Sequence, residues 1–250
     1  MNIGVYQSAA SLTALERWQD VTAQNVTASQ VTGYRKRTVE FSGVPMGAIE
    51  PDPGKNKIGN GDTPQPLFPK AEYGVSFKNG ENYPTQRPLD FAIEGNGFFE
   101  LKRPDGSLTY TRAGSFHISP ERTLVSSDGY ELLNKDGSPV QLVAGAGELA
   151  VVEDGLLVQG TTQLGRIGLK NFSSPSDLTP VAAGFFDPKE GAEAVDVENS
   201  LIIQGNLEGS NVTPMQEMIA LVQIARAYEA NQKSMTTQDQ ILGRAIESLG

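Results

Sequence analysis

The placement of glycine and proline is the feature that most constrains how this 250-residue chain can fold. Of its 27 glycines, 21 lie between residues 44 and 208, and 14 of its 15 prolines lie in the same stretch. Inside a helix, glycine and proline are less favourable than alanine by roughly 1 and 3 kcal/mol. Residues 6–32 contain neither, and residues 215–249 contain only Gly243. Long helices are therefore confined to the two ends, and the middle is expected to form strands and turns.

Residues recur at heptad spacing along both end segments. Positions three and four residues apart share one face of a helix, so each segment presents a lengthwise seam. We predict a first helix ending near Gly33 and a second from about Val212 to Leu249, which pair as a coiled coil and contact neighbouring copies. The second helix has a clear start, because Thr213 suits the N-cap and Pro214 the first helical position. The predicted assembly seam consists of Val5, Leu12, Leu15 and Val26, together with Leu221, Ile224, Tyr228, Asn231, Met235, Leu242 and Leu249.

Polar residues also occupy seam positions, among them Gln19 and Thr22 in the first helix and Gln238 in the second. Polar seam residues weaken a helix pair but specify its register and its partner. The second helix carries a further apolar row, and a helix with two apolar faces requires more than one partner. That row consists of Met215, Met218, Val222 and Ala225. These features favour a role in assembly; the alternative is a two-helix packing element of an ordinary domain.

Asp-Gly dipeptides between apolar runs divide the middle into short strands. Such dipeptides favour the tight turns of β-hairpins, and the clearest pairs residues 98–102 with 108–111 around Asp105-Gly106. We predict a mixed α and β chain whose β-rich middle consists of short antiparallel strands. The shapes of 45–70 and 183–197 are not predicted. The expected organisation is an N-terminal helix (1–35), an extended linker (36–87), a β-rich outer domain (88–206) and a C-terminal helix (207–250).

Composition narrows the function classes. The chain has no cysteine, which excludes disulfides and thiolate chemistry. Its 20 basic and 30 acidic residues give a net charge of −10, which disfavours a nucleic-acid partner. No segment is apolar enough to span a membrane, and the first residues lack the basic cluster and apolar run of a secretory signal. We expect a chain without stable membrane insertion that is cytosolic or leaves the cell without a cleaved signal.

Residues able to support catalysis or hold a cofactor are scarce. The one histidine, His117, lies in an apparent strand, where a structural or surface role is far more common than catalysis. Residues 187–198 are acidic but lack the glycine and spacing of a calcium loop. Residues 145–150 match a dinucleotide fingerprint, yet the helix that such a loop must open does not follow. We therefore predict no catalytic, cofactor-binding or metal-ligating residues; paired carboxylates acting on a glycan remain the alternative.

Over nearly its whole length the chain resembles the flagellar rod and hook proteins of bacteria, the axial subunits of the basal body. Residues 32–35, Thr-Gly-Tyr-Arg, are similar to the Thr-Gly-Phe-Lys that ends this family's Asn-rich signature. The resemblance is carried by three blocks: residues 25–26 with 32–35; residues 87–99 with 110–116; and residues 207–212 with 217–218 and 226–231. The family motif then falls on Asn25, Thr32, Gly33, Tyr34, Gly95, Gly97, Phe98, Gly114, Gly209 and Asn211.

The resemblance implies a structural role in a tubular assembly. It implies that the terminal helices pair as the inner layer of the rod and that the β-rich middle lies outside. It also implies export through the flagellar type III apparatus without a cleaved signal. The rod spans the periplasm, transmits torque and encloses the export channel. The implied partners are copies of the chain, other rod subunits and the export apparatus, with no cofactor.

Within the family, the proximal-rod type fits best and the distal-rod type is next, followed by a hook-type subunit. The chain departs from the family at residues 24–28, where only Asn25 remains of three asparagines. Copy number and position in the rod do not follow from the sequence. The competing class is a secreted β-protein that binds or cleaves glycans.

Overall fold

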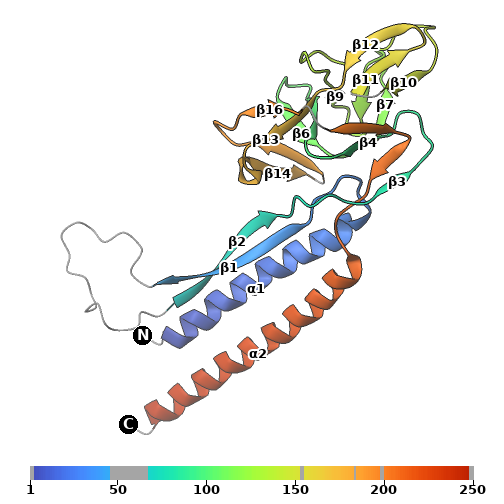
Figure 1. Ribbon diagram of the computed structural model, residues 1–250. Helices are drawn as coiled ribbons and strands as arrows, with labels where there is room; N and C mark the ends of the chain where they lie inside the picture. Colours follow the sequence, from blue (N-terminus) through green and yellow to red (C-terminus); the bar gives the residue numbers. More distant parts are fainter. Residues whose placement is uncertain (1–2, 46–66, 153–154, 183, 198–199, 248–250) are drawn as a thin grey trace, which may run out of the picture. The chain divides into compact units, whose positions relative to one another are not determined.

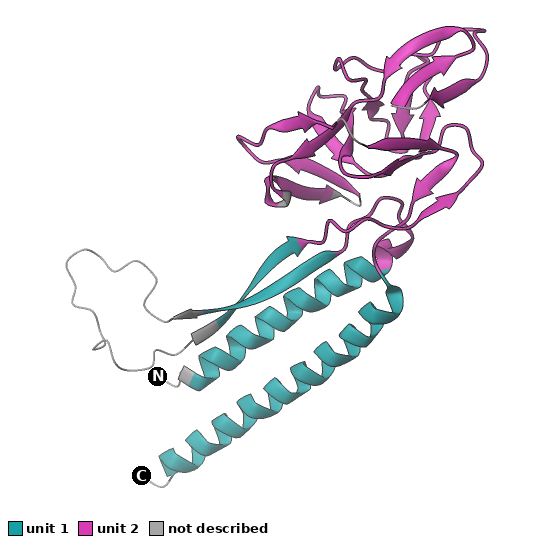
Figure 2. Cartoon of the chain, viewed as in Figure 1, with its two compact units in different colours: residues 1–26, 37–74, 213–250 teal, residues 27–36, 75–212 magenta. Residues whose placement is uncertain are grey.

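The computed structural model of the chain describes residues 3–45, 67–152, 155–182, 184–197 and 200–247. The chain forms two compact units, coloured separately in Figure 2. Unit 1 comprises residues 1–26, 37–74 and 213–250, and unit 2 comprises residues 27–36 and 75–212. The chain therefore passes from one unit to the other at four points, after residues 26, 36, 74 and 212.

Unit 1 contains the two long helices expected from the sequence. Helix α1 spans Ile3–Thr27 and helix α2 spans Pro214–Glu247. Helix α2 begins at the expected proline, and the Thr213 carbonyl accepts backbone hydrogen bonds from Gln216 and Glu217. Strands β1 (Arg37–Pro45) and β2 (Leu67–Val75) pair with each other and run alongside α1 (Figure 1). The segment expected to be a linker thus contains β1, β2 and, further along, strand β3 (Asn82–Pro84).

The predicted coiled coil of the two terminal helices is wrong. The helices are in contact, because the Asn25 side chain donates a 3.0 Å hydrogen bond to Glu217 and Gly4 lies beside Gln238. The seams, however, are not buried along their length. Within the described part of α2 only Glu217 and Ile224 are buried, and Leu242 is 40% exposed.

The reason lies in what covers α1. The rings of Trp18 on α1 and Phe41 on β1 meet edge to face, with centroids 5.6 Å apart. Heptad spacing indicates that a helix has an apolar face but does not identify the element that covers it, and part of α1 packs against a β-hairpin. Of the predicted seam, Leu249 lies outside the described residues.

Unit 2 confirms the expected β-rich middle, and its strands pair in the antiparallel sense. Its largest sheet has the strand order β14-β15-β6-β5-β9-β8-β7, with β13 joining β5 to β16. These strands are β5 (Phe98–Lys102), β6 (Leu108–Thr111), β7 (Phe116–Ile118), β8 (Leu124–Ser126), β9 (Glu131–Leu132), β13 (Leu169–Phe172), β14 (Leu178–Ala182), β15 (Phe185–Pro188) and β16 (Ala194–Asp196).

Three smaller sheets complete unit 2. One has the order β10-β11-β12, and the others pair β17 with β4 and β18 with β3. Short 3₁₀ helices lie at Ala28–Gln30 and Pro175–Asp177. The strands are β3 (Asn82–Pro84), β4 (Phe91–Glu94), β10 (Leu149–Val152), β11 (Leu156–Gln159), β12 (Thr162–Arg166), β17 (Leu201–Gln204) and β18 (Asn206–Glu208).

The hairpin β5–β6 has the bounds expected from the sequence. Lys102 pairs with Leu108 across the turn, and Gly106 has a φ of +86°, which favours glycine. Another Asp-Gly dipeptide, Asp128-Gly129, lies in the tight connection between β8 and β9. Local turn chemistry therefore accounts for the connections β5–β6 and β8–β9.

Buried apolar side chains form two clusters in unit 2. The larger draws residues from β4, β5, β7, β8, β9, β10, β11, β13 and β15, including Phe91, Phe99, Leu101 and Phe116. The smaller consists of Phe98, Tyr110, Phe172, Leu178 and Phe186, with Phe77 packed against it. Unit 2 thus has a core formed by its own residues.

Leu101 and Leu108 provide a matched test of this core, because they lie on adjacent strands and are 0% and 41% exposed. We expect Leu101→Ala to lower the free energy of unfolding of unit 2 by about 2–5 kcal/mol, since it leaves a cavity in the core. Leu108→Ala should change it by only about 0.5 kcal/mol. Native-state hydrogen exchange of amides in β5 and β6 measures both. Equal effects of the two substitutions would contradict this placement of the core.

Candidate functional site

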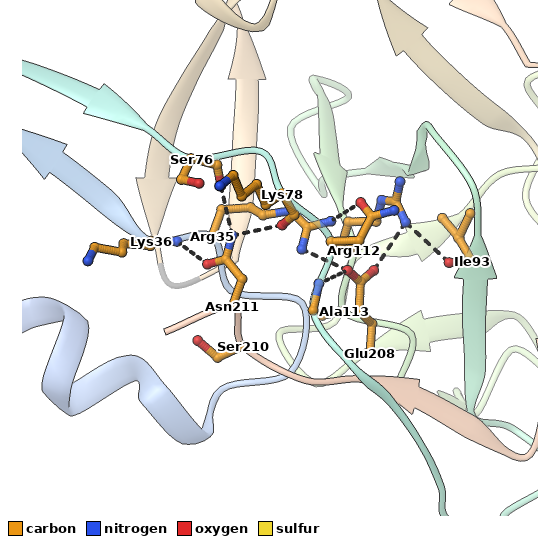
Figure 3. A network of polar contacts seen from close by, with 12 residues as sticks. Arg35, Lys36, Ser76, Lys78, Ile93, Arg112, Ala113, Glu208, Ser210 and Asn211 are labelled. Atoms are coloured by element: carbon orange, nitrogen blue, oxygen red, sulfur yellow. Dashed lines mark hydrogen bonds and ion pairs between the residues drawn. The ribbon is translucent and has the colours of Figure 1, made fainter. Parts of the chain in front are cut away.

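Three charged side chains from distant parts of the sequence meet inside unit 2 (Figure 3). Arg35, which follows the first 3₁₀ helix, places its Nη1 2.7 Å from Oε1 of Glu208 at the end of β18. Arg112, which follows β6, places its Nη1 3.1 Å from the other carboxylate oxygen of Glu208. The exposed fractions of the Arg35, Arg112 and Glu208 side chains are 1%, 3% and 1%. We call these three residues the charge lock.

Backbone groups complete the hydrogen bonding of the charge lock. The backbone N–H of Gly80 donates to Glu208 at 2.8 Å. Arg112 donates to the backbone carbonyls of Ile93 and Gly95, at 3.3 and 2.6 Å. Arg35 donates its second Nη to the Asn79 side chain at 3.2 Å. The lock therefore joins the segments around residues 35, 80, 94, 112 and 208.

The charge lock contains two cations and one carboxylate. Burial lowers the pKa of Arg112 to about 10; Glu208 opposes this shift, and the neighbouring Arg35 adds to it. Removing one partner from a buried ion pair is strongly destabilising, because it leaves an uncompensated charge away from water. Glu208 is the only acidic member, so both arginines depend on it.

Next to the charge lock, the Asn211 side chain joins neighbouring backbone segments (Figure 3). We call this set of hydrogen bonds the Asn211 clasp. Its side-chain oxygen accepts a 2.6 Å hydrogen bond from the backbone N–H of Lys36. Its side-chain nitrogen donates to the carbonyls of Ser76 and Lys78, at 2.9 and 2.7 Å. The position requires a donor and an acceptor on one short side chain, which an amide supplies and a carboxylate does not.

Glycines let these segments approach closely. Gly33 has a φ of +67°, and a Cβ there would overlap the backbone of Arg112 and Ala113. A Cβ at Gly114 would overlap the carbonyl of Phe91. At these two positions the backbones touch where a side chain would otherwise lie.

Comparison with known proteins identifies the family of this chain. Residues 92–159 match the flagellar hook protein FlgE/F/G D1 domain, and residues 203–248 match the flagellar basal body rod FlgEFG protein C-terminal domain. The chain is 33% identical to the flagellar basal-body rod protein FlgF of Rhizobium meliloti, over 100% of this chain and 99% of that protein. The chain belongs to the flagellar basal-body rod protein family. Members of this family are structural and not enzymes.

Two further relatives bear the names of both rod types. The flagellar basal-body rod protein FlgG of Borreliella burgdorferi is 30% identical, over 96% of each chain. The FlgF of Caulobacter vibrioides is 30% identical, over 100% of this chain and 99% of its own length. Within the described residues of this rod-family chain, no helix is long and apolar enough to cross a membrane, and no group of three metal-ligating side chains occurs.

Most residues of the predicted family motif lie around the charge lock and the Asn211 clasp. The backbone N–H of Gly33 donates to the Glu208 carbonyl, and that of Asn211 to the Tyr34 carbonyl. The Phe98 ring lies under the Arg112 guanidinium, 5.6 Å away. Asn25 is separate, in unit 1, where it exchanges hydrogen bonds with the backbone of Arg37. That these residues contribute to function stays a prediction.

Sequence reasoning did not select Arg35, Arg112 or Glu208 as site residues. All three lie in the blocks that resemble the family, but charged residues are normally exposed, so nothing local marks them as buried. The one sign of their role in the sequence was that each lies close to a motif glycine, in a different one of the three blocks. Their pairing itself requires the fold.

Gly33→Ala tests the close approach at the first block. Gly129 is the matched control, because it has a φ of +82° and an added Cβ would meet no atom of the described residues within 4 Å. We expect Gly129→Ala to cost about 1–2 kcal/mol of folding free energy from backbone strain alone. Gly33→Ala should cost more, because the same strain is joined by overlap with the Arg112 backbone. Urea unfolding of both variants measures the difference, and equal losses would refute the close contact.

Glu208→Gln tests the charge lock. The substitution preserves shape but leaves two buried guanidinium groups without a counter-charge, so we expect a loss of about 3–5 kcal/mol in the free energy of unfolding. Glu94→Gln, at an exposed position on β4, is the control and should change stability by about 0.5 kcal/mol. Urea unfolding reads out both variants. If the Glu208→Gln variant were as stable as the control, the free energy of unfolding would not depend on the charge of Glu208.

Proposed function

We propose that this chain is an axial subunit of the flagellar rod that polymerises through exposed faces of its terminal helices. Family membership supports a structural rod subunit. The observation that carries the proposal is an uncovered apolar face near the start of α2. It consists of Met215, Met218, Ile219 and Val222, which are 52–67% exposed.

The spacing of these four residues places them on one side of α2. Positions i, i+3, i+4 and i+7 form a continuous stripe along a helix. Fully burying an aliphatic side chain of this size contributes roughly 1.5–3 kcal/mol, so covering the stripe would contribute several times that amount. Ile241 and Ile246, further along α2, are also exposed, but their spacing places them on other sides of the helix. A neighbouring subunit of the same rod is the proposed cover.

The proposed role includes the mechanical function that the resemblance implies. The rod would transmit torque and enclose the export channel, and the chain would reach the rod across the periplasm through the export apparatus without a cleaved signal. The charge lock and the Asn211 clasp support a load-transmitting role. They hold the segments that lead into unit 1 at residues 36 and 75 by several hydrogen bonds each.

Within the family we favour the proximal-rod type over the distal-rod and hook types. The 33% identity to one FlgF supports this choice, and the 30% identity to a FlgG keeps the distal-rod type as the alternative. Cross-linking within purified basal bodies separates the types by naming the axial neighbours of this subunit.

Met218→Asp and Val222→Asp test assembly through the α2 stripe. Because both positions are exposed, we expect the purified variants to keep the wild-type circular dichroism spectrum and unfolding midpoint. Each carboxylate would be buried at the subunit contact, so swimming and recovery of the protein in purified basal bodies should both be lost.

Gln223→Asp introduces the same charge at an adjacent exposed position outside the stripe. It should retain swimming and incorporation into basal bodies. Normal incorporation of the Met218 and Val222 variants would overturn assembly through this face, and equal loss in all three variants would assign the effect to charge alone.

A further inference from the structure

A small cavity in unit 2 has the two arginines of the charge lock in its wall. Its volume is about 200 Å³, and both Arg35 and Arg112 line it. Part of the cavity wall is apolar and is lined by Phe77, Phe172 and Leu178. Among the described residues that line the cavity none is acidic, so Glu208 pairs with the arginines without reaching the cavity.

The charge lock carries one unmatched positive charge next to this cavity. Two buried guanidinium groups share the single carboxylate of Glu208. Each arginine also has a buried Nε–H that finds no hydrogen-bond acceptor within the part of the chain that the structure describes. Buried charges and buried donors are normally compensated, because leaving them unpaired costs several kcal/mol. The site therefore favours one additional anion.

Size and shape identify the kind of anion. Pockets for drug-sized ligands measure about 300–1,000 Å³, so this cavity accommodates a single functional group with a short stem. A planar carboxylate matches the fork of a guanidinium group, and the phenylalanine side suits a hydrocarbon stem. The excess of one positive charge matches a monoanion better than a phosphate dianion.

We propose that this cavity binds one carboxylate on a short hydrocarbon stem, held by Arg35 and Arg112. Two kinds of molecule carry such a carboxylate: another polypeptide with an acidic side chain, or a free small acid. This inference does not rest on the proposed role in the rod, because it concerns only residues within unit 2.

Titration of the full-length chain with propionate at constant ionic strength, with chloride as the balancing anion, tests the proposal. The Nε–Hε resonances of Arg35 and Arg112 are followed by NMR. We expect a saturable shift of both resonances. A shift that is absent, or that rises linearly without saturation, would overturn the site.

Asn171, which lines the cavity and is half-buried, provides the matched variants. Asn171→Phe fills the cavity without touching the charge lock and should weaken propionate binding by at least about tenfold. Asn171→Ala leaves the cavity open and should retain the wild-type affinity to within about threefold. The same saturable shift in Asn171→Phe as in the wild type would place the binding elsewhere and refute the proposal.

Two capped tripeptides, Gly-Glu-Gly and Gly-Gln-Gly, distinguish the sources. Saturable binding of the glutamate peptide, with none by the glutamine peptide, supports an acidic side chain as the occupant. Binding of propionate but not of the glutamate peptide supports a free small acid. Equal binding of both peptides would refute recognition of the carboxylate. Inorganic phosphate is the remaining probe, and displacement of propionate by phosphate at a lower concentration would overturn the assignment to a monocarboxylate.

Discussion

The rest of unit 2 depends on the requirement that two buried guanidinium groups share the carboxylate of Glu208. Arg35 and Glu208 are 173 residues apart in the sequence, so this pairing joins the two ends of the unit. Gly33 and Gly114 allow the backbones to approach, and the Asn211 side chain fixes the segments alongside. A buried charge tolerates far fewer alternative positions than an apolar side chain, so the charges restrict the arrangements in which the apolar clusters can pack.

Under the proposed assembly, folding and association would draw on different residues of this chain. Unit 2 buries its own apolar clusters and its own charges. Unit 1 leaves a stripe of large apolar side chains of α2 in solvent, and α2 buries Ile224. Under the proposed assembly, a charge placed in the stripe would act on association, whereas a change at Leu101 or Glu208 would act on folding. The subunit would then present a contact face without relying on that face for its own stability.

Local signals in the sequence predicted the elements that depend on local chemistry. Thr213-Pro214 marked the start of α2, and Asp105-Gly106 marked the turn of β5–β6, because caps and tight turns are determined by a few adjacent residues. The coiled coil failed because heptad spacing identifies a face of a helix but not the element that covers it. Trp18, which is not a seam residue, shows that β1 also packs against α1, through its contact with Phe41. The charge lock could not be predicted, since charged residues are exposed by default and only the fold brings Arg35 to Glu208.

A buried charge network contributes little net stability, yet breaking it is costly, and this asymmetry gives it a specific structural role. A shift of one residue at the first block would bring Tyr34 or Lys36 to Glu208. Tyr34 carries no charge, and Lys36 offers a single ammonium in place of a guanidinium fork. The same shift would move Gly33 away from the Arg112 backbone and place a side chain against it. Charge and close packing therefore exclude the same errors of register, so the segments of unit 2 that lead to both helices are held in one arrangement.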